Sequence, residues 1–90
     1  MNKADLIERV SKDTNLTKTQ VENALNCITD WIKKAIKKDE DVKLVGFGTF
    51  TKSKRKARIG RNPQTGAEIK IPASNMPKFK PGKEFKDLIN

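Results

Sequence analysis

The stretch TKSKRKARIGRNPQTGAEIKIPAS, residues 51–74, decides the fold, because it reads as two β-strands joined by a turn. Alternation along residues 52–59 leaves neither side of the first strand apolar enough to be buried in a core. The returning strand brings Ile69 and Ile71 to one side, where Ile59 is expected to meet one of them in a thin apolar seam. Pro72 predicts an edge position or a bulge.

The ribbon is too long to lie within a compact body. Ten extended residues, 52–61, span about 33 Å at roughly 3.3 Å each. A compact chain of 90 residues has a radius of gyration of only about 12 Å. We therefore expect the ribbon to protrude and, as an isolated two-stranded element, to be mobile until a partner binds it.

Positive charge is concentrated in the half of the chain that contains the ribbon. The net charge is +9; residues 1–41 carry eight basic and eight acidic side chains, whereas residues 42–90 carry twelve basic and three acidic. This asymmetry favours nucleic acid over a membrane surface, since no segment has the apolar length of a membrane span or a signal peptide. The alternative is a basic face that only promotes solubility.

The composition argues against catalysis and metal binding. The chain has no histidine, no tyrosine and a single cysteine, Cys27, so the commonest general base, zinc-finger spacing and an internal disulfide are all excluded. The remaining carboxylates and lysines form no catalytic motif. We expect no enzymatic activity, no cofactor, no metal and an intracellular location. Cys27 is interpreted as inert, and Trp31 as part of the packing.

Two helices are predicted ahead of the ribbon. Asn2, with Asp5 three residues later, begins a short amphipathic helix. Thr17 and Gln20 fit a capping box, so the second helix begins near Lys18. Its apolar residues lie within an arc of about 140°, as a core-facing helix requires. Hydrophobic residues make up only 34% of the chain, which suggests that a partner subunit completes the core.

After residue 41 the hydrophobic period changes from 3.6 to 2. The sequence DVKLVGFGTF, residues 41–50, predicts a strand, a glycine-containing turn and the start of a second strand. Beyond the ribbon, Pro77 and Pro81 are expected to stiffen the exit around Phe79, and residues 83–89 predict a short final helix. The residues expected to face inwards are Val42, Leu44, Phe47 and Phe50.

The ribbon's side chains suit phosphates. Lysine offers a point charge to the backbone, and arginine can also fork onto base edges or fill a narrow minor groove. The pattern is specific for nucleic acid but not for a base sequence. The residues concerned are Lys52, Lys54, Arg55, Lys56, Arg58, Arg61 and Lys70.

Two interpretations of Pro63 stay open on chemistry alone. In one, Pro63 presets φ in a type I turn that starts at Asn62, and Gly66 accepts a positive φ. In the other, the rigid apolar ring at the tip of the arm is a wedge that enters between base steps of DNA.

Four motifs carry a family resemblance: GFGTF at 46–50, GRNPQTG at 60–66, IPAS at 71–74 and FKPGK at 79–83. With the opening MNKADLI, they resemble the bacterial histone-like HU/IHF family over all 90 residues, whose members bend DNA through the minor groove.

The resemblance implies an α+β fold in a single DNA-binding domain, residues 1–90. A helical hairpin base for dimerisation (residues 1–41) precedes a three-stranded antiparallel sheet, a long protruding β-ribbon arm (about residues 52–75) and a short C-terminal helix. The resemblance further implies an intertwined homodimer or heterodimer. The partner of that dimer is double-stranded DNA.

The resemblance also implies roles for residues at matching positions. Pro63 matches the intercalating proline, and Phe47, Phe50 and Phe79 match the dimer core. Many members have arginine where this chain has Ser53, and Ala67 and Lys70 replace residues that are often acidic. The expected DNA-binding residues are Lys3, Gly46, Lys52, Lys54, Arg55, Lys56, Arg58, Arg61, Asn62, Pro63, Gln64, Lys70, Lys80 and Lys83.

The leading hypothesis is therefore an HU-like protein of the bacterial nucleoid, in the cytoplasm, that bends and compacts double-stranded DNA largely without sequence specificity. One alternative is a sequence-specific IHF-like subunit, in which indirect readout selects deformable sites. Another is an RNA-binding protein, which the charge permits but the proline-tipped arm does not favour.

Overall fold

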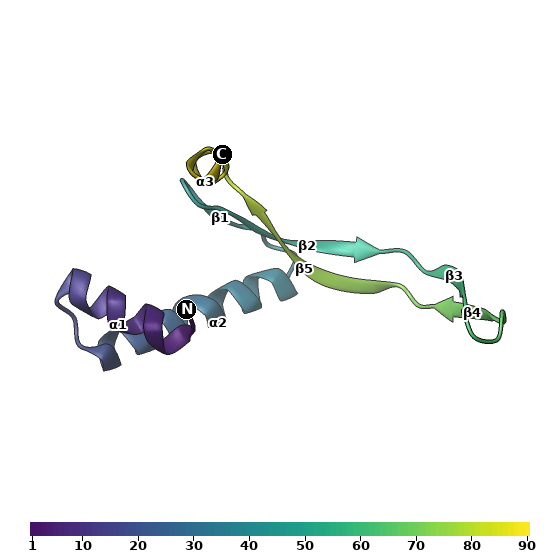
Figure 1. Cartoon of the computed structure of the whole chain (residues 1–90), viewed down its shortest axis with the longest axis horizontal. Coiled ribbons are helices and arrows are strands. Elements are labelled where there is room, and N and C mark those ends of the chain that lie inside the picture. Colours follow the sequence, from purple (N-terminus) through teal and green to yellow (C-terminus); the bar gives the residue numbers. More distant parts are fainter. The chain divides into compact units, whose positions relative to one another are not determined.

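The computed structural model describes residues 1–90, which form two compact units, Met1–Lys34 and Ala35–Asn90 (Figure 1). The elements are α1 (Lys3–Thr14), α2 (Lys18–Lys37), β1 (Val42–Leu44), β2 (Gly48–Arg55), β3 (Arg58–Arg61), β4 (Glu68–Ile71), β5 (Ser74–Pro81) and α3 (Lys83–Ile89). The predicted α+β class, with helices, antiparallel strands and a β-arm, is confirmed.

Both predicted helix starts are confirmed by reciprocal hydrogen bonds. The Asp5 N–H donates to Asn2 Oδ1 (2.9 Å) and the Asn2 N–H donates to Asp5 Oδ2 (3.1 Å). At α2, the Gln20 N–H donates to Thr17 Oγ1 (3.1 Å), and the Thr17 N–H donates to Gln20 Oε1 (3.0 Å). Each pair satisfies two backbone donors that a helix start leaves without partners.

The helical unit buries very little by itself. Ile7 and Val21 are its only buried hydrophobic side chains, at 8% and 6% exposure. Leu16 and Ile28 stay 45% and 54% exposed. An open groove between α1 and α2 has an almost entirely apolar lining that includes Leu6, Ile7, Val10, Leu16, Val21 and Leu25. The helical unit therefore presents an apolar surface that its own side chains do not cover.

In the second unit, β1, β2 and β5 form an antiparallel sheet in the order β1-β2-β5. Residues 74–81, for which the sequence predicted only an exit stiffened by Pro77 and Pro81, are a strand that pairs with β2 along its whole length. Pro77 lies opposite Lys52, and Pro81 opposite Gly48. Both prolines are tolerated because β5 is an edge strand, where a missing N–H need not break a ladder.

The ribbon continues from β2 and β5 into a second, two-stranded sheet of β3 and β4 (Figure 1). The expected continuous strand over residues 52–61 is interrupted at Lys56 and Ala57, opposite Pro72 and Ala73. Two residues are left unpaired on each strand of the ribbon. Because the number is equal, the register continues across the interruption and no bulge forms. Pro72, which has no N–H to donate, lies in this interruption.

The pairing within the ribbon differs from the expected seam. Ile59 lies opposite Lys70, while Ile69 and Ile71 lie opposite Gly60 and Arg58. Because directly paired residues share a face, Ile59 is on the other face from both isoleucines. Ile71 instead covers the backbone at Gly60, where a Cβ would stand 3.1 Å from Ile71 Cδ1.

Four phenylalanines cluster where the sheet meets α3. The ring of Phe79 lies 4.9 Å from Phe50, 5.1 Å from Phe47 and 6.4 Å from Phe85, centroid to centroid. Phe47 also stacks on Phe85 at 5.4 Å. Even so, Phe47 and Phe79 keep 43% and 36% of their surface exposed. The cluster is thus an open apolar surface and not a closed core.

Gly48, which is buried, leaves no room for a side chain beside this cluster. A Cβ there would lie 2.5 Å from Phe79 Cζ and 2.6 Å from the Lys80 carbonyl oxygen. We therefore expect Gly48→Ala to lower the free energy of unfolding by about 1–3 kcal/mol, measured by urea denaturation. Gly82→Ala is the matched control. Its Cβ would meet atoms no closer than 3.4 Å, and the φ of Gly82, −74°, is one that alanine adopts readily. Equal urea midpoints for the two variants would contradict this steric account.

Candidate nucleic-acid interface

One face of the three-stranded sheet carries four cations, and the other carries the phenylalanines together with Lys52 and Lys54. Phe50 lies opposite Phe79, so the odd-numbered residues of β2 and their partners point the other way. On that face, which we call the outer face, Lys43, Thr49 and Lys80 form a row across the three strands, and Thr51 lies opposite Lys78. Arg55 continues the outer face toward the ribbon. All four cations are exposed.

Two of these cations, Lys43 and Lys78, are not among the DNA-binding residues predicted from the sequence. The signal for Lys43 was present, since it lies between Val42 and Leu44, which were expected to face inwards. Lys78 could not be placed until residues 74–81 were recognised as a strand. The structure therefore extends the basic surface from the ribbon onto the sheet.

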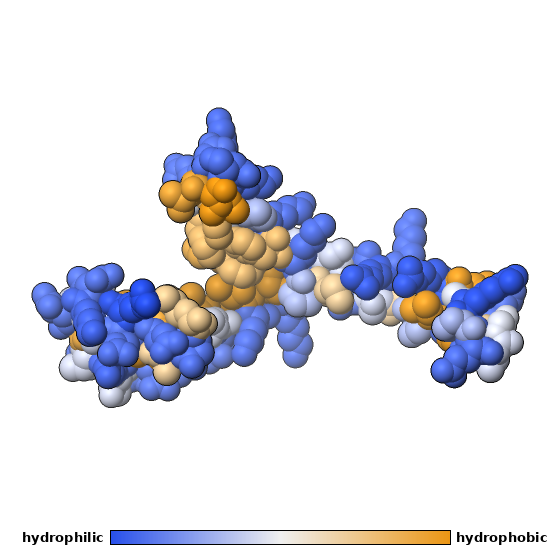
Figure 2. Space-filling model, in the orientation of Figure 1, coloured by the Kyte–Doolittle hydropathy of each residue, from blue (hydrophilic) through white to orange (hydrophobic).

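The ribbon carries cations on both of its faces. Arg58 shares a face with Ile69 and Ile71, and Arg61 and Lys70 lie on the opposite face. Where the two sheets meet, a shallow hollow is lined by Arg55, Lys56, Arg58, Ile71, Pro72 and Ser74. Lys54 and Lys56 are also exposed. Figure 2 shows this part of the chain as mostly hydrophilic, with a few hydrophobic residues between the polar ones.

The turn at the tip is held by its own side chains. The Asn62 N–H donates to the Ala67 carbonyl (2.9 Å), and the Gly66 N–H donates to the Asn62 carbonyl (2.7 Å), one residue beyond the expected type I turn. Asn62 Oδ1 accepts from the Gln64 N–H (2.9 Å), and Thr65 Oγ1 accepts from the Ala67 N–H (3.3 Å). Gly66 has the expected positive φ, 71°. Pro63 is left exposed within this closed loop.

The expected body contacts fall in both units. Within Ala35–Asn90, Gly46 is the middle residue of the turn between β1 and β2. The Gly82 N–H donates to the Phe47 carbonyl (2.8 Å), so Gly46, Lys80 and Lys83 gather at one end of the sheet. Gly46 has a φ of 85°, and Glu84 Oε2 would lie 3.0 Å from a Cβ placed there.

Lys3 belongs to the helical unit, where its position depends on a residue of the other helix. Its Nζ donates to Asn26 Oδ1 at 2.6 Å. Because the amide of Asn26 is neutral, this hydrogen bond holds the Lys3 side chain between α1 and α2 without pairing it with an acidic group. This arrangement suits a fixed contact with an anion.

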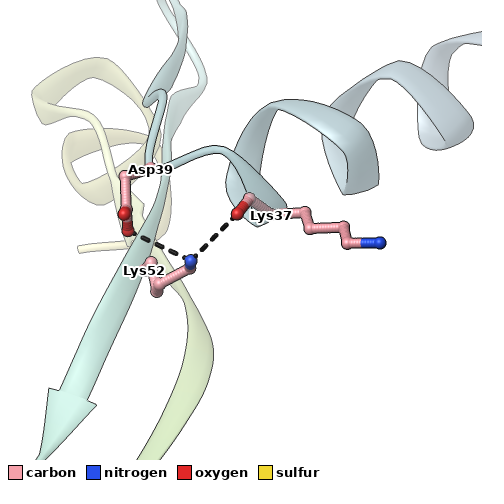
Figure 3. Close-up of polar contacts among 3 residues, drawn as sticks. All are labelled: Lys37, Asp39 and Lys52. Atoms are coloured by element: carbon pink, nitrogen blue, oxygen red, sulfur yellow. Dashed lines mark hydrogen bonds and ion pairs between the residues drawn. The ribbon is translucent and has the colours of Figure 1, made fainter.

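Lys52 differs from the other predicted contacts, because its ammonium is already bound within the chain (Figure 3). Nζ lies 3.1 Å from the Lys37 carbonyl oxygen and 3.1 Å from Asp39 Oδ1. The hydrogen bond and the charge of Lys52 hold the pKa of Asp39 below its ordinary value, and Lys54 adds a smaller attraction.

A ribbon with cations on both faces and an exposed proline at its closed tip defines a protein that binds an extended polyanion. None of the three helices combines the length and the apolar character that crossing a membrane requires.

Comparison with known proteins identifies the family. The family model described as bacterial DNA-binding protein matches residues 1–90. DNA-binding protein HU of Clostridium pasteurianum is 50% identical over 90 residues, which cover 100% of this chain and 99% of that protein. A cocrystal structure of Anabaena HU with DNA matches with a TM-score of 0.92 at 39% identity, covering 99% of this chain and 97% of that one. HU from Thermotoga maritima matches with a TM-score of 0.71 at 33% identity over 100% of both chains.

The chain therefore belongs to the family of bacterial DNA-binding proteins that comprises HU and IHF. The curated relatives of similar identity are mostly named HU, which favours the HU-like hypothesis over the IHF-like one and over RNA binding.

Proposed function

We propose that this protein is an architectural protein of the bacterial nucleoid that binds double-stranded DNA through the minor groove and bends and compacts it, largely without sequence specificity. It acts in the cytoplasm, without enzymatic activity. The observation that carries the proposal is the ribbon, which is cationic on both faces and closed by a turn that exposes Pro63. Such a ribbon suits a groove bounded by phosphates on both sides.

The proposed DNA contacts combine the sequence-based set with the two lysines that the outer face adds. The ribbon and the outer face neutralise phosphates, while the exposed main chain of Gly46 lets the backbone approach one closely. The set is Lys3, Lys43, Gly46, Lys54, Arg55, Lys56, Arg58, Arg61, Asn62, Pro63, Gln64, Lys70, Lys78, Lys80 and Lys83. Lys52 is left out of this set because its ammonium is already bound to the Lys37 carbonyl and to Asp39.

The protein acts as a dimer in this proposal, and a homodimer is the simplest form, although the same surfaces admit a paralogue. The support is the small amount of surface that one chain buries: the groove between α1 and α2 is open, and Phe47, Phe50 and Phe79 form an uncovered apolar surface. A second chain on these surfaces would supply the missing core.

Pro63 is the wedge in this proposal. Its ring enters between two base pairs, and the unstacking, which costs a few kcal/mol, is offset by the contacts that a bent duplex permits. The hydrogen bonds of Asn62 and Thr65 close the turn that contains Pro63, so that the wedge is rigid when it meets the duplex.

Pro63→Ala is expected to retain most of the affinity for DNA and to bend it less, because phosphate contacts persist while the wedge is lost. Fluorescence transfer between dyes at the two ends of a short duplex, at saturating protein, measures the bend. Gln64→Ala is the matched comparison at the same tip: it removes another proposed DNA contact but keeps the proline ring, so the bend at full occupancy should persist. Unchanged transfer with Pro63→Ala at full occupancy would show that Pro63 only closes the turn.

A further inference from the structure

Lys52 occupies a different environment from its neighbour Lys54, although both lie on β2 and have the same strand parity. The Lys52 side chain is only 15% exposed, and its ammonium contacts the end of α2 and the turn that follows (Figure 3). Lys54 is exposed. The three residues that meet here, Lys37, Asp39 and Lys52, all belong to the unit Ala35–Asn90. We call them the root clamp, because β2 is the strand from which the arm begins.

The first contact of the clamp completes the end of α2. The Glu40 N–H donates to the Ala35 carbonyl (2.9 Å) and the Asp39 N–H donates to the Ile36 carbonyl (3.1 Å), which is the pattern of a Schellman motif. The Lys37 carbonyl accepts no backbone N–H within this motif, and Lys52 Nζ donates to it instead. A cation at this end of a helix is also favoured by the helix dipole.

The second contact accounts for an aspartate in an unfavourable backbone conformation. Asp39 has a φ of 61°, in the left-handed region where a Schellman motif normally places glycine. Its carboxylate is the group that glycine lacks, and that carboxylate pairs with Lys52. The lowered pKa of Asp39 agrees with this pairing.

We propose that Lys52 is a positioning residue that fastens the root of the arm to the end of α2, and that its charge is used inside the chain and makes no contact with phosphate. Only one part of this inference rests on the proposed function: the claim that Lys52 makes no phosphate contact is tested by DNA binding. Lys52 lies next to Phe50 on β2, on the face away from the outer-face cations.

DNA binding separates Lys52 from Lys54. We expect Lys54→Met to lower the log–log salt slope of binding by about 0.9 for each phosphate contact removed. Lys52→Met should leave the slope unchanged. An equal fall in slope for both variants would overturn the assignment of Lys52. A slope near zero for the unmodified protein would instead refute the proposed function. Urea unfolding of the free protein would then still test whether the root clamp exists.

The clamp itself is measured without DNA, by urea unfolding of Lys52→Met, Asp39→Gly and the double variant. Asp39→Gly keeps the turn, because glycine adopts the same φ readily, and removes only the carboxylate. We expect Lys52→Met to lower the urea midpoint less in the Asp39→Gly background than in the unmodified chain. Strictly additive effects would overturn the clamp.

The pH dependence of stability distinguishes an ion pair between Lys52 and Asp39 from simple packing of the Lys52 side chain. Because the folded pKa of Asp39 is lowered, the stability from its pairing is complete above the ordinary aspartate pKa of about 3.9 and is lost as the pH falls through the lowered value. Lys52 and Lys54 are the cations that act on Asp39. The gap in stability between the unmodified protein and Lys52→Met should therefore narrow on the acid side. A gap that stays constant from pH 7 to below Asp39's folded pKa would contradict the ion pair.

Discussion

Raising the salt concentration from 50 to 200 mM is expected to weaken binding to duplex DNA by about 10³ to 10⁵. This range corresponds to six to ten neutralised phosphates, each of which releases condensed counterions when a lysine or arginine replaces them. The ribbon and the outer face supply enough exposed cations for that number. No comparable dependence is expected from a basic surface that serves only solubility.

The measurement is a titration of a labelled random-sequence duplex at several salt concentrations, plotted as log affinity against log salt. A triple variant, with Lys54, Lys56 and Arg58 changed to Gln, should lower the slope by about 0.9 for each phosphate contact removed, and by up to about 5.4 if all six cations lost from the proposed homodimer contact phosphate. Lys12→Gln is the control, because Lys12 lies on α1, beside Glu8 at 3.6 Å, outside the proposed contacts. A slope near zero, or one that Lys12→Gln lowers as much as the triple variant does, would remove the phosphate account.

Phe47→Ala is expected to unfold the protein and dissociate the dimer in the same transition. The Phe47 ring contacts Phe79 and Phe85 at centroid distances of 5.1 and 5.4 Å, and its exposed 43% is surface that we assign to the second chain. Truncating a buried phenylalanine costs about 3–5 kcal/mol, a large share of the roughly 5–15 kcal/mol that stabilises a typical domain.

Sedimentation and circular dichroism over a range of protein concentrations test this expectation. Val45→Ala is the control two positions away, because its side chain is 90% exposed and its loss should change stability by no more than about 0.5 kcal/mol. A Phe47→Ala protein that sediments as a folded monomer would show that the phenylalanine cluster is not part of the dimer interface.

The helix starts and the ribbon could be predicted from the sequence because their signals are local. A capping box needs only two side chains three residues apart, as at Thr17 and Gln20. The strand 74–81 could not be predicted in this way. Pro77 and Pro81 normally argue against a strand, and they are acceptable here only because β5 is at the edge of the sheet, which depends on the whole topology.

The pairing of Ile59 was wrong for a similar reason. The hydrogen bond from the Asn62 N–H to the Ala67 carbonyl sets the register of the ribbon, and counting back from it places Ile59 opposite Lys70. Hydrophobic matching alone suggested Ile69 or Ile71. In this exposed ribbon, where neither face is buried, hydrophobic pattern specifies register weakly and the turn decides it.

The candidate site was predictable as a set of charges but not as a set of contacts. Composition and alternation were sufficient to find the cationic ribbon and the exposed tip. They could not separate Lys52 from Lys54, because the difference lies in the turn at Asp39, which is distant in sequence and meets β2 only in the folded chain. Lys78 depended on the strand that was not foreseen.

The shallow core has a consequence for the protein in the cell. Ile7 and Val21 are the only buried hydrophobic side chains of one chain, so we expect the stability of the proposed dimer to depend on protein concentration. We therefore expect a newly made chain to be open to proteolysis until it pairs with a second chain. The amount of working protein should therefore rise more steeply than the rate of synthesis, and unpaired chains should be cleared. Because each chain depends on another for its packing, we expect folded protein to accumulate only above a threshold rate of synthesis.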